Sequence, residues 1–200
     1  MGTVLVLGGA LTLADDGGDQ TTSTAPENTP STPPPSAQQE PTTSFTGPSA
    51  SPARGVPRLL TVPHLGIQST VRRIATSGGV LTPPEDAREV GWDVASAAVG
   101  SAYGSSIITG HTVHTGGGAL DELDDLDVGD KVMVTTDKGR IRYVVSSVSE
   151  FTKQEMVKAI PRLYSGDVPG RLVLITCTDW NGVDYDANTV VFARPDAGTL

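Results

Sequence analysis

Short runs of β-branched and apolar residues recur through the C-terminal part of the chain, and each is bounded by Gly, Pro, Asp or other polar residues. Strands favour side chains of this kind, so the pattern predicts β-strands separated by turns. The runs lie at residues 58–62, 68–71, 105–110, 131–136, 140–148, 171–177 and 188–193. Residues 137–139 (DKG) separate two of them and are typical of a hairpin turn.

Helical periodicity is less frequent. Residues 118–126 carry three Leu residues spaced three apart, and residues 153–163 predict a short helix that is interrupted at Pro161. Many strands and few short helices in a segment of about 140 residues indicate a mainly β protein. A closed or nearly closed β-barrel is the architecture that this pattern predicts.

The N-terminal segment has a different character. Residues 3–14 are mostly apolar and uncharged, but a bilayer span needs about 20 such residues. The run also lacks the basic start of a signal peptide. We interpret residues 1–14 as a possible remnant of a membrane anchor, and the alternative is an apolar N-terminus without such a role.

A low-complexity segment follows at residues 15–57, with nine Pro and fourteen Ser or Thr. Such a segment buries too little apolar surface to offset the entropy of ordering it. Its Pro-rich stretches favour extended polyproline conformations. This composition predicts either a disordered stalk of the kind that crosses a cell wall or an ordinary disordered tail. The globular domain is therefore expected at residues 58–200.

The charge and cysteine content exclude several classes of function. The chain has 23 acidic and 14 basic residues, for a net charge of −9. Nucleic acids and anionic membrane surfaces attract basic faces, so neither is expected as the main partner. The single cysteine excludes an intrachain disulfide and a zinc site built on several thiolates.

That cysteine, Cys177, ends the apolar run 171–177 and is followed by polar residues. At the end of a strand, a side chain can reach a cleft while its backbone is held rigidly. A buried cysteine that packs as a small apolar residue is the alternative. An unpaired thiol is unusual outside the cell and needs a reason there. From position alone, both interpretations stay open.

Two histidines, His111 and His114, follow the predicted strand at 105–110, whereas His64 lies in a turn and is expected to be exposed. His111 and His114 have no third ligand at a suitable spacing, so no metal site is expected there. A histidine at the end of one strand can meet a cysteine at the end of another. A cationic neighbour of this kind favours the nucleophilic thiolate.

Two further groups of residues allow alternative interpretations. A cluster of carboxylates lacks the spacing of a calcium loop and is interpreted as a solvated surface rather than a calcium site. The cluster consists of Asp121, Glu122, Asp124, Asp125, Asp127 and Asp130. Trp92 and Trp180 either pack around the site and the barrel ends or stack on a substrate.

Several segments together resemble the sortase family. Residues 172–177 (LVLITC) resemble the TLxTC signature, and residues 107–111 (IITGH) resemble the Gly-His motif at the end of a strand. Residues 119–136 resemble the short helix, LxxGD turn and strand between these motifs. Residues 59–71 and 83–92 resemble the opening strands and the Pro-rich loop of class F or E enzymes of actinobacterial type. The motifs occur in order across nearly all of the globular segment.

This resemblance implies a closed sortase β-barrel of about eight strands and a cysteine transpeptidase that needs no cofactor. Such enzymes act outside the cytoplasmic membrane, anchored in it or associated with the cell wall. They cleave the LPxTG-type sorting signal of secreted proteins between Thr and Gly through a thioacyl intermediate. The acyl group is then transferred to an amine, such as that of a peptidoglycan precursor or of another protein.

The resemblance also implies roles for individual residues. Cys177 would be the nucleophile and His111 the group that protonates the leaving amine, with His114 a bystander. Thr176, Trp180 and Trp92 are assigned to substrate binding.

One position departs from the family pattern. Sortases carry an arginine near the start of the last strand, where it stabilises the oxyanion, and here Asp186 and Asn188 occupy the corresponding positions. The Asn188 amide is the candidate oxyanion donor, although it brings no positive charge. Arg194, Arg73 and Arg142 are alternatives among which the sequence does not choose.

Two other functions fit the chain less well. The missing arginine suits a non-catalytic surface domain that binds a peptide or a wall component. An L,D-transpeptidase would have Gly directly before the cysteine and Arg soon after it, whereas Cys177 follows Thr176 and precedes Thr178.

Overall fold

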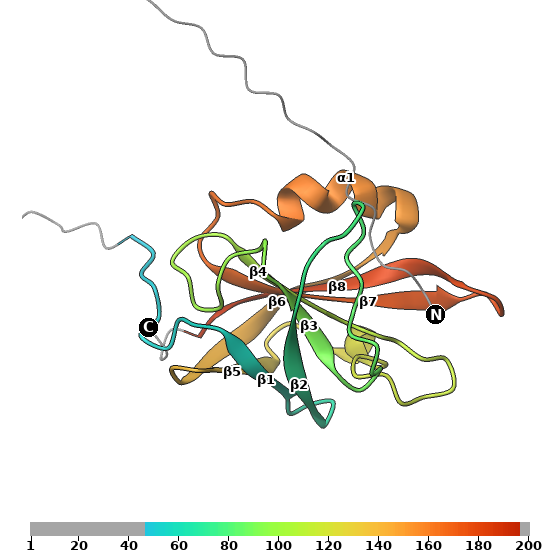
Figure 1. The fold of residues 1–200 in the computed structure, drawn as a ribbon, viewed down its shortest axis with the longest axis horizontal. Helices are drawn as coiled ribbons and strands as arrows, with labels where there is room; N and C mark the ends of the chain where they lie inside the picture. The colour runs from blue at the N-terminus through green and yellow to red at the C-terminus, as the bar shows by residue number, and fades with distance from the viewer. Residues whose placement is uncertain (1–46, 197–200) are drawn as a thin grey trace, which may run out of the picture. The chain divides into compact units, whose positions relative to one another are not determined.

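In the computed structural model, residues 47–196 are described, and within them eight strands close into a barrel (Figure 1). The prediction of a mainly β closed barrel is confirmed. The strands are β1 (Pro57–Val62), β2 (Ile67–Ile74), β3 (Val90–Asp93), β4 (Ser105–Gly110), β5 (Lys131–Thr136), β6 (Arg140–Thr152), β7 (Arg171–Trp180) and β8 (Tyr185–Pro195). The sequence pattern missed β3, which is only four residues long and contains a glycine.

The strands follow one another around the barrel in the order β1-β2-β3-β4-β7-β8-β6-β5, and β5 closes it by pairing with β1. The neighbours are antiparallel except for two parallel pairs, β2 with β3 and β4 with β7. A parallel pair brings the same ends of two strands together. The segment that follows β4 therefore leaves the barrel on the same side as the C-terminal half of β7.

Apolar side chains form two clusters, one on each face of the central strands. Leu172 and Leu174 of β7 point into the barrel interior, whereas Val173, Ile175 and Cys177 belong to a second cluster on the outer face. Because both faces of β7 are covered, its sequence is apolar without alternation. Figure 1 shows α1 lying along the outside of the barrel next to β7 and β8, where it covers the second cluster.

The helix α1 (Lys153–Leu163) begins at Thr152, which forms a capping box with Glu155. Its buried residues Met156, Ala159 and Leu163 are spaced three or four apart, as expected for one face of a helix. The predicted interruption at Pro161 is wrong. The helix continues to Leu163, whose burial in the outer cluster holds the last turn in place.

The helix expected at 118–126 is only a short 3₁₀ turn, η1 (Leu123–Asp125), and no side chain caps it. The three leucines of this segment, Leu120, Leu123 and Leu126, are nevertheless all buried in the barrel interior. Their spacing therefore reports burial at one end of the barrel rather than a regular helix.

Ordered packing begins before the predicted boundary at residue 58. The backbone N–H of buried Ser51 donates to the carbonyl of Gly100 at 2.9 Å, and Gly55 pairs with Val99. Thr136 Oγ1 donates to the carbonyl of Ala53 at 2.6 Å. The end of the segment assigned to the stalk thus lies against the barrel because its backbone groups find partners there.

The segment assigned to a membrane anchor, 1–14, and residues 15–46 of the stalk lie outside the described residues. Within residues 47–196, no helix has the length and apolar character needed to cross a bilayer.

Candidate active site

Cys177 and Asn188 face each other across the β7–β8 hairpin. They are direct register partners in an antiparallel pair, so their side chains project from the same face of the sheet. Both side chains are buried, with 7% of Cys177 and 5% of Asn188 exposed. The strand was expected to end at Cys177, but β7 continues to Trp180 because β8 pairs with it.

The environment of Cys177 disfavours the thiolate. The pKa of the thiol is raised to about 11, chiefly by burial and also by the nearby carboxylate of Asp184, whereas the ammonium of Lys153 lowers it. At neutral pH the thiol is therefore protonated unless another positive charge approaches it. Any nucleophilic role for Cys177 requires such a charge or a base.

The segment that carries His111 is tied to the residue directly before Cys177. Thr176 Oγ1 donates to the carbonyl of Gly110 at 3.0 Å and lies 2.7 Å from Thr112 Oγ1. Because Thr112 Oγ1 can also donate to the carbonyl of Leu120 at 3.4 Å, either hydroxyl can be the donor between the two threonines. The two neighbours of His111 are thus both bonded to Thr176, and His111 directly follows β4, the parallel neighbour of the strand that carries Cys177.

A hydrogen bond also orients the ring of His111. Its Nε2 lies 2.9 Å from the carbonyl oxygen of Pro84. A carbonyl only accepts, so Nε2 carries a proton, and in the neutral ring Nδ1 is the free acceptor. The backbone of the β2–β3 connection therefore selects the tautomer of His111 and leaves Nδ1 to exchange a proton.

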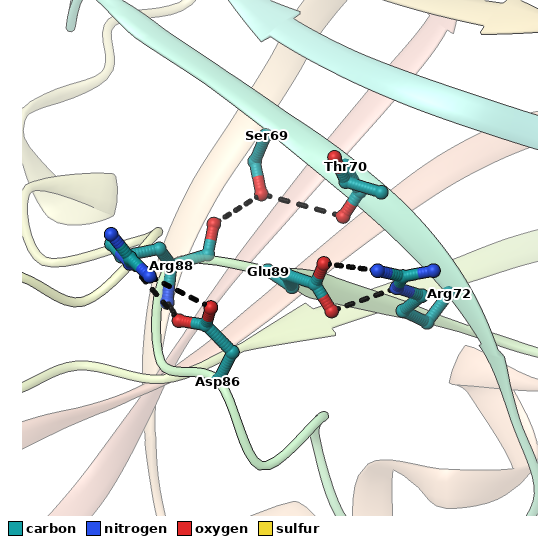
Figure 2. A network of polar contacts seen from close by, with 6 residues as sticks. All are labelled: Ser69, Thr70, Arg72, Asp86, Arg88 and Glu89. Atoms are coloured by element: carbon teal, nitrogen blue, oxygen red, sulfur yellow. Dashed lines mark hydrogen bonds and ion pairs between the residues drawn. The ribbon is translucent and has the colours of Figure 1, made fainter.

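A polar network anchors the end of that connection to β2, as Figure 2 shows. The guanidinium of Arg72 binds both carboxylate oxygens of Glu89, at 2.8 and 2.6 Å. Ser69 Oγ donates to the carbonyl of Arg88 at 2.7 Å. Further along, the carbonyl of Ala87 accepts from the backbone N–H of Ala119 at 2.7 Å. The loop that orients His111 is thus held from both sides.

His111 lines a cavity of about 250 Å³. The other lining residues are Glu85, Ala87, Thr112, Val113, His114, Trp180 and Tyr185. Trp180 forms one wall, with the ring of His114 stacked on it at 4.1 Å between centroids and Tyr185 tilted against it at 5.0 Å. Trp180 therefore lines the same cavity as His111, with His114 packed against it, and its contact with substrate stays a prediction.

Two residues assigned to substrate binding are placed elsewhere. Trp92 is 6% exposed in the interior cluster, and its Nε1 donates to the carbonyl of Ala97 at 3.4 Å. Thr176 is 2% exposed, and its hydroxyl is occupied by Gly110 and Thr112. Trp92 therefore packs in the core and Thr176 holds two strands together, and a contact of either residue with substrate stays a prediction.

Asn188 has a buried polar atom that forms no hydrogen bond within the described part of the chain. Its Oδ1 is buried without a hydrogen-bond partner among residues 47–196. An orphaned buried group costs about 1–3 kcal/mol, so its retention opposite Cys177 is consistent with a role toward a bound molecule.

The arginines considered as substitutes lie away from Cys177. Arg73 stacks over the ring of Trp92 at 5.7 Å, and Arg142 lies 3.9 Å from Asp196. Arg194 is six residues beyond Asn188 on β8, which corresponds to about 20 Å along an extended strand.

Lys153 is a cation that lowers the pKa of Cys177, and its Nζ lies 2.9 Å from Asp184 Oδ2. No local sequence pattern marks Lys153, because it belongs to no recognised motif and follows β6 rather than β4 or β7.

The residues considered as metal ligands make contacts that support loops instead. Among residues 47–196, no group of three or more His, Cys, Asp or Glu side chains is arranged to hold a metal ion. Within the acidic cluster, Asp121 accepts from the backbone of Val113 and Gly118 at 2.7 and 2.9 Å, and Asp130 pairs with exposed His64 at 2.8 Å. These contacts hold loops together.

Comparisons with known proteins agree with this arrangement. The sortase-domain family model matches residues 60–196. Sortase C-1 from Actinomyces oris is similar in structure, with 22% identity, coverage of 69% of this chain and 72% of that one, and a TM-score of 0.53. A lid mutant of sortase A from Corynebacterium diphtheriae has 19% identity, coverage of 72% and 71%, and a TM-score of 0.54. Sortase C-3 from Streptococcus pneumoniae has 18% identity, coverage of 72% and 64%, and a TM-score of 0.57.

At these identities, the structural matches establish the fold. No curated protein sequence matches the chain. Assignment to class F or E stays a prediction, because the matched domain carries no class and the three solved structures are of classes A and C.

Proposed function

Since the chain belongs to the sortase family of cysteine transpeptidases, we propose that it cleaves an LPxTG-type sorting signal between Thr and Gly and transfers the acyl group to an amine. The observation that carries this proposal is the coupling of His111 and Cys177. His111 directly follows β4, Cys177 lies on the parallel neighbour β7, and Thr176 bonds to both neighbours of His111. No other thiol is available, because Cys177 is the single cysteine of the chain.

In the first step, the Cys177 thiolate attacks the carbonyl carbon of the signal's Thr. A C–S bond forms and the carbonyl oxygen becomes an oxyanion. Protonated His111 then gives a proton to the Gly nitrogen, the C–N bond breaks, and a thioacyl enzyme remains. The bond between His111 Nε2 and Pro84 supports Nδ1 as the atom that transfers this proton.

In the second step, a neutral amine attacks the thioester carbon. The new C–N bond replaces the C–S bond, His111 takes up the proton released by the amine, and the thiolate returns. Splitting one amide exchange into two acyl transfers lowers each barrier. Asn188 is directly opposite Cys177, and its amide N–H is the proposed donor to the oxyanion in both steps.

Trp180 is the proposed substrate contact, because it lines the same cavity as His111 and is 37% exposed. Secreted proteins with a C-terminal sorting signal are the proposed substrates, and an amine of a peptidoglycan precursor or another protein is the proposed acceptor. We propose an extracytoplasmic location, with residues 1–14 as a remnant anchor and residues 15–57 contributing the stalk.

The test is to incubate the full chain with a panel of fluorophore-labelled LPxTG-type peptides and an amine acceptor. We expect an amide product and a covalent acyl-enzyme detectable by mass spectrometry. Cys177→Ala should abolish both, and His111→Ala should lower the rate by roughly 10²–10⁴-fold. The proposal fails if no peptide gives either species, or if Cys177→Ala keeps the activity.

A non-catalytic domain that binds a peptide is the alternative. The buried thiol with a pKa of about 11 is the observation that favours it. In that case, labelled peptides would bind equally well to the wild-type chain and to Cys177→Ala, and neither protein would form a covalent adduct.

A further inference from the structure

Lys153 lies on the far side of β8 from the strand that carries Cys177. Phe151 of β6 pairs with Asn188 of β8, and Asn188 pairs with Cys177 of β7, so these three residues form one row across the sheet. Lys153 comes two residues after Phe151, as the first residue of α1. Its side chain begins close to the row that contains the thiol.

The ammonium of Lys153 reaches the turn that joins β7 to β8. There its Nζ contacts Asp184 Oδ2 at 2.9 Å. Asp184 directly precedes Tyr185, the first residue of β8. The pair thus bridges the start of α1 and the hairpin that holds both Cys177 and Asn188.

The pair is only weakly required for folding. The side chains of Lys153 and Asp184 are 53% and 51% exposed, and an exposed ion pair contributes about 0–1 kcal/mol to stability. Water competes for both partners, so Lys153 can leave Asp184 at small cost when another negative charge forms nearby. The negative charges formed in the proposed reaction are the thiolate and the oxyanion.

The ionisable groups near Cys177 come from three directions. Asp184 raises the pKa of the thiol and Lys153 lowers it, after the larger effect of burial. The phenol of Tyr185 also interacts with Cys177, and Asp186 acts on Lys153. His111 approaches from β4. Asp184 and Lys153 therefore act on Cys177 with opposite signs, although they bind each other.

We propose that Lys153 supplies the positive charge that stabilises the Cys177 thiolate and the oxyanion, and that Asp184 holds Lys153 when the site is empty. This inference rests on the proposed function for the oxyanion but not for the thiolate. In this chain, Asp186 and Asn188 occupy the positions of the family arginine. Lys153 would then supply the positive charge that those two residues do not. Lys153 would move toward the reacting atoms as their charge develops, leaving Asp184 to the solvent.

The pH dependence of Cys177 alkylation by iodoacetamide tests this without any sorting peptide. In Lys153→Gln, the midpoint of the rate profile should rise by roughly 0.5–1 pH unit, and in Asp184→Asn it should fall by a similar amount. Lys153→Arg should keep the wild-type midpoint. Lys158→Gln is the matched control, because Lys158 is exposed on the same helix and lies near Glu155.

The same variants are then assayed for transpeptidation. We expect Lys153→Gln to lower kcat about tenfold with little change in KM, and Lys153→Arg to restore most of kcat. The inference is overturned if Lys153→Gln and Lys158→Gln give the same alkylation midpoint, or if Asp184→Asn raises it. If the midpoints move as expected but no variant transfers a peptide, the effect on the thiol stands and the proposed function fails.

Discussion

The hydroxyl groups of Thr112 and Thr176 lie 2.7 Å apart, and this contact joins the segment after β4 to β7 at the level of the candidate catalytic pair. Thr176 also donates to the carbonyl of Gly110 at 3.0 Å. One buried side chain therefore fixes the residues on both sides of His111 relative to the residue before Cys177.

Thr176→Val should separate positioning from packing. The substitution keeps the β-branched shape but leaves the Gly110 carbonyl without this donor, at a cost of about 1–3 kcal/mol in the free energy of unfolding. We expect kcat for transpeptidation to fall at least tenfold, because His111 loses its fixed position. Thr176→Ser keeps the hydroxyl and should retain most of kcat. Equal kcat in the Val and Ser variants would contradict the positioning role.

The fold was predictable because its strands carry local signals. The β-branched runs on β4, β5 and β7 lie where the structure has them, since strand propensity and turn residues act over a few positions. The strand β3 (Val90–Asp93) carries no such signal, because its four residues are buried on both faces and pair with neighbours distant in sequence.

Only the part of the site that lies within the sequence motifs could be predicted from the sequence. The motifs around His111 and Cys177 identified the two strands, whereas the roles of Trp92 and Thr176 depend on which face of the sheet each side chain points to. Lys153 was missed because its contact with Asp184 spans 31 residues and forms only when β6 and β8 pair. A charge brought close by tertiary structure leaves no local pattern in the sequence.

Replacing Asn188 should increase the stability of the fold and lower the rate of acyl-enzyme formation. Asn188→Val removes the buried Oδ1 that has no partner among the described residues, and Val suits a strand. We expect the free energy of unfolding to rise by about 1 kcal/mol. Acyl-enzyme formation should fall by roughly 10²-fold, as for the loss of one oxyanion donor. Urea unfolding and single-turnover kinetics measure the two effects, and unchanged kinetics would exclude Asn188 as the donor.

The raised pKa of Cys177 should appear in the pH dependence of stability. The unfolded thiol ionises near pH 9, whereas the folded thiol has a pKa of about 11. The unfolded state therefore loses its proton first, and stability falls as pH rises through this window. Relative to Cys177→Ala, the wild-type chain should lose on the order of 2 kcal/mol between pH 8.5 and 11. Parallel unfolding curves for the two proteins would contradict the buried, protonated thiol.

The ion pair between Arg72 and Glu89 should affect catalysis at a distance. Arg72→Gln removes the bidentate ion pair with Glu89 that anchors the β2–β3 connection. This connection contains Pro84, whose carbonyl orients the ring of His111. We expect kcat to fall about threefold to tenfold with the fold retained. Arg88→Gln is the control, because Arg88 pairs only with nearby exposed Asp86 and should leave kcat unchanged. An equal effect of both variants would show that surface charge, not loop position, matters.

Gly110 should tolerate no side chain, because neighbouring core residues leave no room for one. This steric limit explains why glycine precedes His111. A Cβ at this position would lie 2.8 Å from Leu120 Cγ and 3.0 Å from Val90 Cγ1, and both neighbours are fully buried in the interior cluster. Neither can retreat without opening the core, so Gly110→Ala should lower the free energy of unfolding by about 1–3 kcal/mol. Because Gly110 also accepts from Thr176, the displaced backbone should lower kcat as well.

The double variant Gly110→Ala with Leu120→Ala distinguishes overpacking from a loss of backbone freedom. Removing the Leu120 side chain makes room for the new methyl group, so the double variant should be less destabilised than the sum of the two single variants. Urea unfolding of the four proteins measures this coupling. Strictly additive losses would mean that Gly110 is needed for a reason other than the close approach of Leu120.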